Sequence, residues 1–309
     1  MNKKGFEFSF AWLFALFVGV AIIFLAIYAA SSFLKTGSEE HTSKVAAELG
    51  VLLNPIGTNL ESSKRYSLTL PEETRIFNEC VEEGTFGLQR LSVSTLSGLG
   101  EAWPKPGVPA SFADKYVFSS DVVQGKELEL FVKPLYIPYK VGDLIILYAS
   151  PLCFVAPPNW VEDEISAAGA RYVNITSNYS DCPRESISVC FAGGNCNVTV
   201  IMEDDRSGRV MKRGQPLFFY DSLLYGAIVS DKKQYDCQVM RLRKRAGEIA
   251  RLYLGKTELL SAQGCSSGLE IDLRNYAEHL ATSTSTLSSL IYESKLLGEN
   301  NEKLSCKLF

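Results

Sequence analysis

Residues 8–34 read FSFAWLFALFVGVAIIFLAIYAASSFL and contain no charged side chain. A helix needs about 20 mostly apolar residues to cross the hydrocarbon core of a bilayer, so this run is long enough. Lipid offers the backbone no hydrogen-bond partner, and a helix satisfies its own backbone groups. We therefore expect a single transmembrane helix within residues 1–34. A buried helix of a soluble core is the weaker alternative, because such helices rarely stay apolar on every side.

The flanking charges predict the orientation of this helix. Lys3 and Lys4 precede the run, whereas Lys35 follows it with two glutamates close behind. Positively charged flanks stay on the cytoplasmic side of a membrane. We therefore expect the N-terminus in the cytoplasm and residues 35–309 on the outer side of the cell membrane.

Two kinds of cleavage compete with a permanent anchor. An ordinary secretory signal has an apolar region of about 7–15 residues, which is shorter than this run, but the small residues at 29–31 leave such cleavage open. The motif Lys3-Lys4-Gly5 before the run resembles the class III signal peptide of type IV pilin-like proteins. In that family a dedicated peptidase cuts after the glycine, and the helix serves first as a membrane anchor and then as a filament core.

This resemblance implies that Phe6 becomes the first residue of the mature chain. Many pilins carry Glu at the fifth mature position, where this chain has Phe10, and its acid is Glu7 at the second position. Archaeal members are looser in this respect. A pilin-like N-terminus joined to a large Cys-containing domain looks most like archaeal surface proteins.

Small residues line one face of the predicted helix. Ala11, Ala15 and Gly19 follow one another at four-residue spacing. Small side chains let helix backbones approach closely, and packing of this kind drives helix association in lipid. The pattern favours self-association or contact with pilin-like partners, and the alternative is that Ala and Gly are simply common in membrane helices.

The remaining sequence predicts a domain with both strands and helices. Apolar runs of the kind typical of strands occur at residues 66–70, 76–80, 86–93, 143–148, 171–176, 185–191 and 197–202. Pro71 ends the first of these, and Gly and Pro residues predict a surface loop over 98–114. Residues 161–168 predict a short helix, with Asn159 as its N-cap and Gly169 at its end.

Three of these segments, the strand at 143–148, the short helix and the strand after it, have the length of a βαβ unit. The last two predicted strands indicate a hairpin whose turn contains Gly193 and Gly194. Residues 210–220 indicate a second hairpin around Gly214.

The C-terminal third changes character. Apolar residues repeat at three and four over 231–263 and again over 267–297, which predicts two helices packed on the sheet as an antiparallel pair. A Thr/Ser run at 282–286 weakens the middle of the second helix. The polar segment 35–65 indicates a stalk. We therefore expect an α/β or α+β extracytoplasmic domain over 66–309, with a mixed sheet and a C-terminal helix pair.

Composition narrows the class of partner. The chain has 309 residues, of which 46% are hydrophobic, so it can bury a substantial core. Its formal charge is −4, and residues 1–34 carry +1, which leaves −5 on the rest. A mildly acidic domain argues against nucleic acid as the partner.

The chain has eight cysteines, all beyond the apolar run: Cys80, Cys153, Cys182, Cys190, Cys196, Cys237, Cys265 and Cys306. No CxxC pair occurs, and both histidines lie far from the cysteines that cluster between 153 and 196. Zinc sites use closely spaced Cys or His pairs, so disulfides are favoured over metal binding and over free thiols.

Two disulfides can be expected individually. Cys190 and Cys196 flank the turn of the predicted hairpin and should bond to each other. Cys153 and Cys182 flank the predicted βαβ unit and are the weaker preference. A Cys237–Cys265 bond is unlikely to form, because the two residues lie near opposite ends of the first C-terminal helix.

Three Asn-x-Ser/Thr sequons lie in the Cys-rich stretch, at Asn174, Asn178 and Asn197. One such sequon arises easily by chance. Three within a short segment on the predicted outer side favour glycosylation of a cell-surface protein.

Two charged clusters have both a functional and a structural interpretation. The cluster formed by Arg241, Arg243, Lys244 and Arg245 could bind an anion, but a solvated helix face is favoured. The acidic segment 203–208 lacks the spacing of an EF-hand, so a turn is favoured over Ca²⁺ binding.

The sequence carries no catalytic motif of the GxxxxGKS, GxGxxG, HExxH or GxSxG type. His279 beside Glu278 fits a surface histidine. We assign no catalytic residue, metal ligand or cofactor, and we expect a membrane-anchored surface protein with a structural, binding or adhesive role. The alternatives are an anchored accessory or assembly factor that does not polymerise, and an extracytoplasmic hydrolase.

Overall fold

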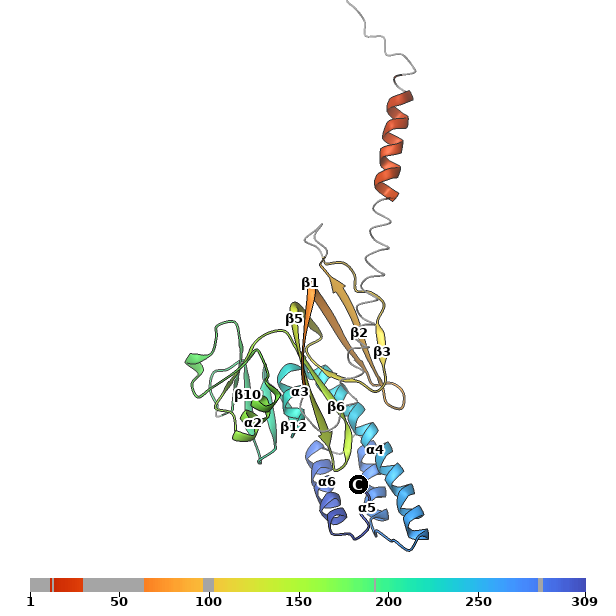
Figure 1. Ribbon diagram of the computed structural model, residues 1–309, viewed down its shortest axis with the longest axis vertical. Coiled ribbons are helices and arrows are strands. Elements are labelled where there is room, and N and C mark those ends of the chain that lie inside the picture. The colour runs from red at the N-terminus through yellow and green to blue at the C-terminus, as the bar shows by residue number, and fades with distance from the viewer. Residues whose placement is uncertain (1–11, 13, 30–63, 97–102, 192, 283–285) are drawn as a thin grey trace, which may run out of the picture.

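The computed structural model describes residues 12, 14–29, 64–96, 103–191, 193–282 and 286–309. Residues 14–29 form a helix that stands apart from the other described elements, and the remainder is an α+β arrangement of two mixed sheets with helices near the C-terminus (Figure 1). This is one of the two fold classes that the sequence predicts. None of the helices in the described ranges combines the length and the apolarity needed to cross a membrane.

The first sheet, sheet A, has six strands. They are β1 Lys64–Val81, β2 Leu88–Thr95, β3 Ala110–Phe112, β4 Tyr116–Phe118, β5 Val122–Tyr136 and β6 Lys140–Tyr148. Their order in the sheet is β3-β2-β1-β5-β6-β4, and all neighbours are antiparallel except β4 and β6. Strand β3 lies within the segment for which the sequence predicts only a surface loop.

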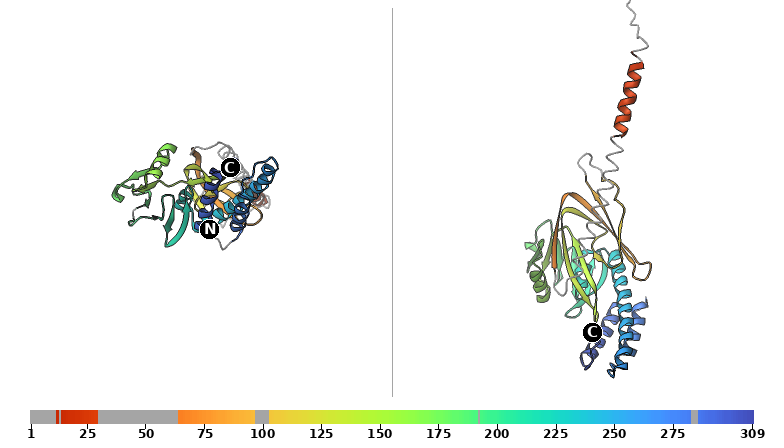
Figure 2. Two further views of the ribbon diagram at one scale, coloured as in Figure 1. Left: turned by 90° about the horizontal axis from the view of Figure 1, so that it is seen from below. Right: turned by 45° about the vertical axis from the view of Figure 1, so that its right-hand side comes forward.

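The strands of sheet A lie between the helix of residues 14–29 and the C-terminal helices (Figure 2), and side-chain hydrogen bonds show that the sheet curves back on itself. Strand β4 lies at one edge, yet Asn78 Nδ2 on β1 donates to Val117 O on β4 at 3.2 Å. Val117 N in turn donates to Gln89 Oε1 on β2 at 3.3 Å. Buried apolar side chains, among them Ile76 and Leu128, share one cluster with Val117. The curved sheet therefore encloses a small core of its own.

The second sheet, sheet B, also has six strands. They are β7 Leu152–Val155, β8 Val173–Thr176, β9 Ile187–Cys190, β10 Val198–Met202, β11 Ser207–Lys212 and β12 Gln215–Tyr220. Their order is β12-β11-β10-β9-β7-β8, with antiparallel pairing from β12 to β10 and parallel pairing from there to β8. The predicted hairpin around Gly214 is confirmed, and this glycine has a φ of 76°, which residues with a Cβ rarely adopt.

The helices beyond residue 150 are α2 Asn159–Ala168, α3 Leu223–Val229, α4 Lys232–Ala262, α5 Glu270–Ala281 and α6 Leu287–Glu302. Helices α4 to α6 lie at the end of the molecule opposite to the helix of residues 14–29 (Figure 1). The larger apolar core lies between sheet A, sheet B and these helices. At its centre the rings of Phe131 on β5 and Tyr225 on α3 meet edge to face, with their centroids 5.0 Å apart.

The predicted end of the first strand at Pro71 is wrong, because β1 continues past it to Val81. Strand β1 pairs with β5 up to Thr69 and again from Thr74, so Pro71 lies in an irregularity between two ladders. Its missing N–H therefore costs no ladder hydrogen bond. The last two residues of the predicted stalk, Lys64 and Arg65, already belong to this strand, and the rest of the stalk lies outside the described residues.

The βαβ unit exists, but its first strand is β7 and not the run at 143–148. That run belongs to β6 in sheet A, and Leu152–Val155 pairs in parallel with β8 after the helix. Gly169 ends the helix in the left-handed conformation, as predicted. Asn159 is not the N-cap, because Pro158 occupies that position and Asn159 is the first helical residue.

The predicted hairpin around Gly193 and Gly194 is wrong, because β9 and β10 run parallel. After Cys190 the chain turns back and re-enters the sheet with Val198 beside Val189. The two glycines have φ values of 80° and 133°, which permit this short return.

The second predicted C-terminal helix is two helices, α5 and α6. Helix α5 ends at Ala281, where the Thr/Ser run begins, and the hydroxyl of Thr286 caps α6 by accepting a hydrogen bond from Ser289 N. The first predicted helix corresponds to α4 within one residue at each end.

Candidate functional site

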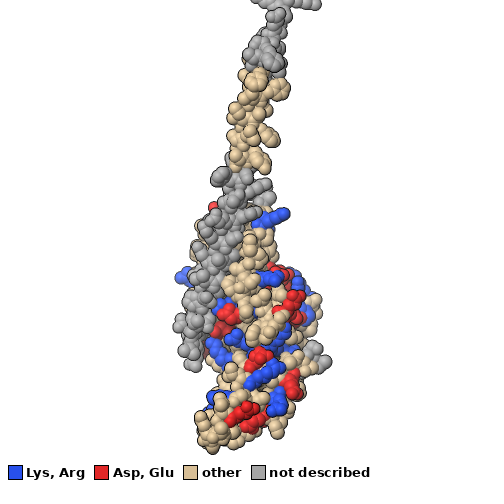
Figure 3. Space-filling model, turned by 90° about the vertical axis from the view of Figure 1, so that its right-hand side faces the viewer, with Lys and Arg blue, Asp and Glu red and all other residues tan. Residues whose placement is uncertain are grey.

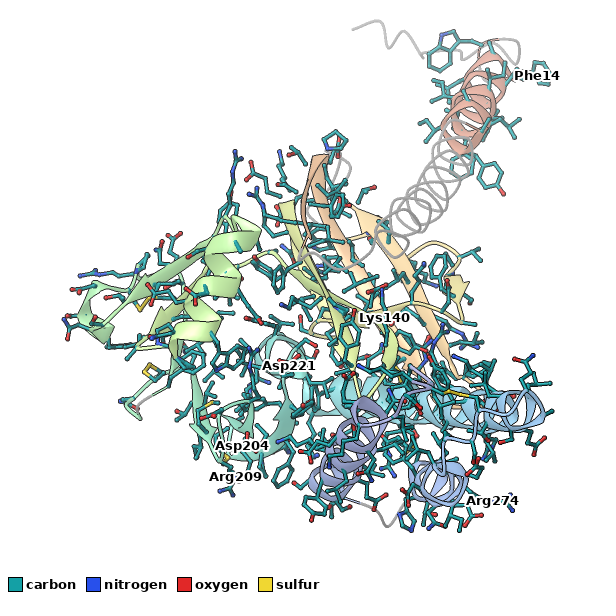
Figure 4. The ribbon with its side chains drawn as sticks, turned by 60° about the horizontal axis from the view of Figure 1, so that its bottom comes forward. Phe14, Lys140, Asp204, Arg209, Asp221 and Arg274 are labelled. Carbon is teal, nitrogen blue, oxygen red and sulfur yellow. A yellow bond between two sulfur atoms is a disulfide. The ribbon has the colours of Figure 1, made fainter. Side chains whose placement is uncertain are left out.

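The helix of residues 14–29 exposes most of its apolar surface. The exposed fraction of its large apolar residues runs from 39% at Val18 to 70% at Phe24, and Phe14 projects outward from the helix (Figure 4). The visible face of this helix carries no charged atoms, whereas Lys, Arg, Asp and Glu alternate over the domain (Figure 3). Among the described elements this helix is the most apolar surface offered to a partner.

Two of the residues predicted to support helix association lie on this helix. Ala15 and Gly19 are one turn apart and therefore share a face. A Cβ atom built on Gly19 meets no atom within 4 Å, so the face is open. The other predicted N-terminal residues, Lys3, Lys4, Gly5, Phe6 and Ala11, lie outside the described residues.

Four disulfides join all eight cysteines: Cys80–Cys237, Cys153–Cys182, Cys190–Cys196 and Cys265–Cys306. The Cα–Cα distances lie between 5.7 and 6.2 Å, inside the usual range for a disulfide. The second and third pairs are those expected from the sequence. The framework is compatible with an extracellular protein, because disulfides persist in oxidising compartments.

The other two disulfides could not be assigned from spacing. Cys80 on β1 and Cys237 on α4 are 157 residues apart in sequence and fasten the long helix to sheet A. Cys265 and Cys306 fasten the loop after α4 to the segment after α6. Both pairs depend on how the C-terminal helices fold back, which no local pattern reveals.

The three sequon asparagines are all exposed and belong to sheet B and its loops. Asn174 lies on the edge strand β8, and Asn178 lies in the bend after it. Asn197 lies immediately before β10. The three sequons are neighbours in the sequence, and in the structure all three lie on sheet B or its loops.

The basic cluster is not a solvated helix face at its first position. Arg241 is fully buried, and its guanidinium donates to the backbone carbonyls of Phe86, Ala113 and Lys115 at 2.8–3.0 Å. The guanidinium also lies 4.8 Å from the ring centroid of Tyr116. Arg241 therefore binds α4 to two loops of sheet A, the one between β1 and β2 and the one between β3 and β4.

The remaining members of the cluster are also partly committed to the fold. Arg243 is 8% exposed and donates to Thr282 O at 2.6 Å. Lys244 donates to two carbonyls in the turn between β1 and β2. Arg245 is half-buried. The four side chains do not form one surface that could bind an anion.

Residues 203–206 of the acidic segment form the turn between β10 and β11, and residues 207 and 208 begin β11. Asp204 Oδ1 accepts from the backbone N–H groups of Arg206 and Ser207 at 2.9 and 2.7 Å. Burial acts to raise the pKa of Asp204, but these hydrogen bonds outweigh it and hold the pKa below its ordinary value. Across the described part of the chain, no cluster of three or more His, Cys, Asp or Glu side chains is arranged to hold a metal ion.

His279 lies in an open groove of about 320 Å³ between α5 and α6. Its Nδ1 lies 2.8 Å from a carboxylate oxygen of Glu293. The groove also contains Asp272 and Asn275, but no Ser, Thr or Cys lies among the described residues that line it. The one hydroxyl among these lining residues belongs to Tyr276 and donates to Ile137 O at 3.1 Å. The exposed ring of His279 fits the predicted surface histidine.

A cluster that the sequence did not reveal lies where sheet A, α2 and α3 meet. Glu164 accepts from Lys133 Nζ at 3.1 Å, Arg206 Nη1 at 3.2 Å and the Tyr225 hydroxyl at 2.7 Å. Arg206 also pairs with Asp221, which lies beside α3 (Figure 4). Burial and the Glu164 carboxylate raise the pKa of Tyr225 above its ordinary value. The two acidic and two basic side chains balance in charge, so the cluster fastens α2 and the β10–β11 turn to sheet A and α3 and leaves no net charge for a ligand.

The described chain is thus an α+β domain with four disulfides and a separate apolar helix. It matches no protein-family model, no curated protein and no solved structure.

Proposed function

We propose that this chain is a membrane-anchored surface protein with a pilin-like N-terminus, whose domain lies outside the cell membrane and has a structural or binding role. The single observation behind the proposal is the exposed apolar helix of residues 14–29.

Exposing an apolar helix to water is unfavourable in free energy. Covering one large apolar side chain is worth about 1.5–3 kcal/mol, and residues such as Phe17, Ile22 and Phe24 are all more than 60% exposed. The sequence stays apolar on both sides of this helix, over 8–13 and 30–34. Lipid acyl chains are the cover that suits such a run on every face.

Two further features support an external domain. The lysines before the apolar run favour a cytoplasmic N-terminus. The four disulfides of the described domain suit an oxidising compartment. Together they support a folded domain on the opposite side of the membrane from Lys3.

The decisive experiment is labelling of intact cells with a membrane-impermeant amine reagent, followed by peptide mapping. Exposed lysines of the domain, such as Lys232 and Lys233, should be labelled in intact cells, before any lysis. A cytoplasmic protein serves as the control for leakage. Protection of Lys232 and Lys233 in intact cells, with labelling only after lysis, contradicts the proposed topology.

The filament subunit and the non-polymerising accessory factor differ at the N-terminus of the mature protein. Processing after Gly5 yields Phe6 as the first residue and permits a filament role, as in the pilin-like family. An intact Met1 or Asn2 leaves an anchored domain that stays in the membrane. N-terminal sequencing of the native protein separates the two.

A further inference from the structure

We propose that Asn178, and neither Asn174 nor Asn197, is the attachment site of an N-linked glycan. The inference rests on the proposed external location of the domain, because glycan transfer occurs on that side of the membrane. All three asparagines have the required Ser or Thr two residues later. They differ in whether the asparagine side chain and the sequon hydroxyl, which the transferase must reach, are already hydrogen-bonded within the fold.

Asn178 leaves its side chain available. It is exposed and lies in the bend between β8 and the short 3₁₀ turn Tyr179–Asp181. Its side-chain amide makes no hydrogen bond to any described residue. Only its backbone atoms do so: the N donates to Thr176 Oγ1, and the O accepts from Thr176 Oγ1 and from Asp181 N. The hydroxyl of its sequon partner Ser180 is exposed and makes one long hydrogen bond of 3.3 Å to Asp181.

Asn174 is less available because its sequon is part of a strand. It pairs opposite Cys153 in the β7–β8 ladder, so its backbone is held extended. The hydroxyl of its partner Thr176 donates to Asp181 Oδ2 at 3.2 Å and accepts from Asn178 N at 3.2 Å. A transferase that binds this hydroxyl would have to break contacts that shape the following bend.

Asn197 is bound by its own side chain. Its Oδ1 accepts from Ser188 N at 3.0 Å and from the Ser188 hydroxyl at 2.8 Å. Its sequon partner Thr199 lies on β10 between two neighbouring strands, opposite Cys190 and Met211. Modification at Asn197 would therefore disturb the turn that lets β9 and β10 run parallel.

The space around Asn178 suits a bulky polar group. Strand β8 is the last strand of sheet B, so its outer edge has no neighbouring strand among the described residues. The Cys153–Cys182 disulfide holds the bend in place beside this edge. A glycan two residues beyond the strand would cover hydrogen-bonding groups that otherwise invite edge-to-edge pairing with another chain.

The transfer forms one bond and breaks one bond. Asn178 Nδ2 attacks the anomeric carbon of an oligosaccharide carried on a lipid pyrophosphate, and the new carbon–nitrogen bond replaces the bond from that carbon to the pyrophosphate oxygen. The lipid pyrophosphate leaves with the electron pair, and the amide proton passes to a base of the transferase. No oxidant or reductant is needed.

The test is glycopeptide mapping of the full-length protein from its native membrane. Trypsin releases residues 172–184, which contain Asn174 and Asn178, and residues 185–206, which contain Asn197. Electron-transfer fragmentation keeps the glycan attached and so assigns it within the first peptide. We expect a glycan mass on Asn178, with the other two asparagines unmodified.

A matched pair of variants checks the assignment. Ser180→Ala removes the sequon without changing Asn178 and should abolish the added mass, whereas Ser177→Ala changes an exposed neighbour in the same bend and should retain it. A glycan on Asn174 or Asn197 with Asn178 bare overturns the proposal. Three bare asparagines, in a protein whose lysine labelling places the domain outside, also overturn it and leave the proposed function standing. A domain labelled only after lysis overturns both.

Discussion

The ring of Phe118 on β4 lies directly against Gly226 on α3: a Cβ atom at residue 226 would lie 2.5 Å from Phe118 Cδ1. Both residues are buried, and α3 leads the chain from sheet B into the long helix α4. This contact sets how closely α3 approaches sheet A. The glycine is therefore required by packing and not by backbone conformation.

The first prediction compares two helical glycines. Gly226→Ala should lower the free energy of unfolding by about 1–3 kcal/mol, because the new Cβ would overlap the ring of Phe118, which is fully buried. Gly255→Ala on α4 should raise it by about 0.5–1 kcal/mol, because a Cβ there meets nothing within 4 Å and alanine favours helix. Urea unfolding in detergent, followed by near-ultraviolet circular dichroism, measures both. Equal effects of the same sign would contradict the contact.

The second prediction concerns the buried Arg241. Arg241→Met keeps much of the apolar volume but leaves the carbonyls of Phe86, Ala113 and Lys115 without a donor. We expect a loss of about 3–5 kcal/mol in the free energy of unfolding, since buried polar groups left unpaired cost about 1–3 kcal/mol each. Lys244→Met, three residues along the same helix and half-buried, is the control and should cost below about 1 kcal/mol. Similar losses for both variants would show that the contacts of Arg241 are dispensable.

The third prediction ranks two disulfides by the chain that each one closes. Replacing Cys80 and Cys237 together by Ala frees a loop of 157 residues, and chain entropy alone gives about 5 kcal/mol. The same change at Cys190 and Cys196 frees a separation of 6 residues, for which the same relation gives about 2 kcal/mol. Guanidinium unfolding of the two double variants should therefore show the larger loss for the first. The reverse order would indicate that native strain or residual structure outweighs loop closure.

The fourth prediction concerns stability at alkaline pH. Burial raises the pKa of five tyrosines above their ordinary value of 10.0: Tyr139, Tyr148, Tyr225, Tyr235 and Tyr276. Above about pH 10 the unfolded chain loses these protons while the folded chain keeps them, so stability is full below that pH and falls as the pH rises. Each tyrosine contributes a slope of about 1.4 kcal/mol per pH unit.

Unfolding free energies measured between pH 8 and 11, with tyrosinate absorbance as a second readout, test this slope. Tyr235→Phe should reduce it by about 1.4 kcal/mol per pH unit, since the variant removes one titrating group. A stability that stays constant to pH 11 would mean that these hydroxyls reach solvent in the folded state.

The elements that sequence reasoning predicted well are those with a local signal. The periodic pattern of α4, the Gly169 helix end and the Gly214 hairpin each depend on neighbouring residues alone. The errors occurred where contacts between residues far apart in the sequence determine the structure. Strand β1 continues through Pro71 because β5 pairs with it both before the proline, up to Thr69, and after it, from Thr74. The run 143–148 joins sheet A because β5 pairs with it.

The same division holds for the functional residues. Cysteine spacing was enough for Cys153–Cys182 and Cys190–Cys196, whose partners are near in sequence. It was not enough for Cys80–Cys237, nor for the burial of Arg241, which in sequence looks like any other basic residue on a helix. The side chains of the Glu164 cluster come from four separate parts of the chain, so no local sequence motif could predict it.

The last prediction separates processing from assembly at the N-terminus. Gly5→Leu should block cleavage if the pilin-like signal is used, and the protein should then keep its first five residues, as intact mass shows. Gly19→Leu should leave cleavage unchanged but weaken helix association, because a large side chain holds neighbouring backbones apart. Filaments, if this chain builds them, should be lost in both variants. Phe10 stands where many pilins carry an acid to pair with a neighbour's new amine, and Glu7 would meet that amine at a different height. We therefore expect cleavage after Gly5 even where no filaments form. An intact Met1 in the native protein would contradict the resemblance to a class III signal peptide.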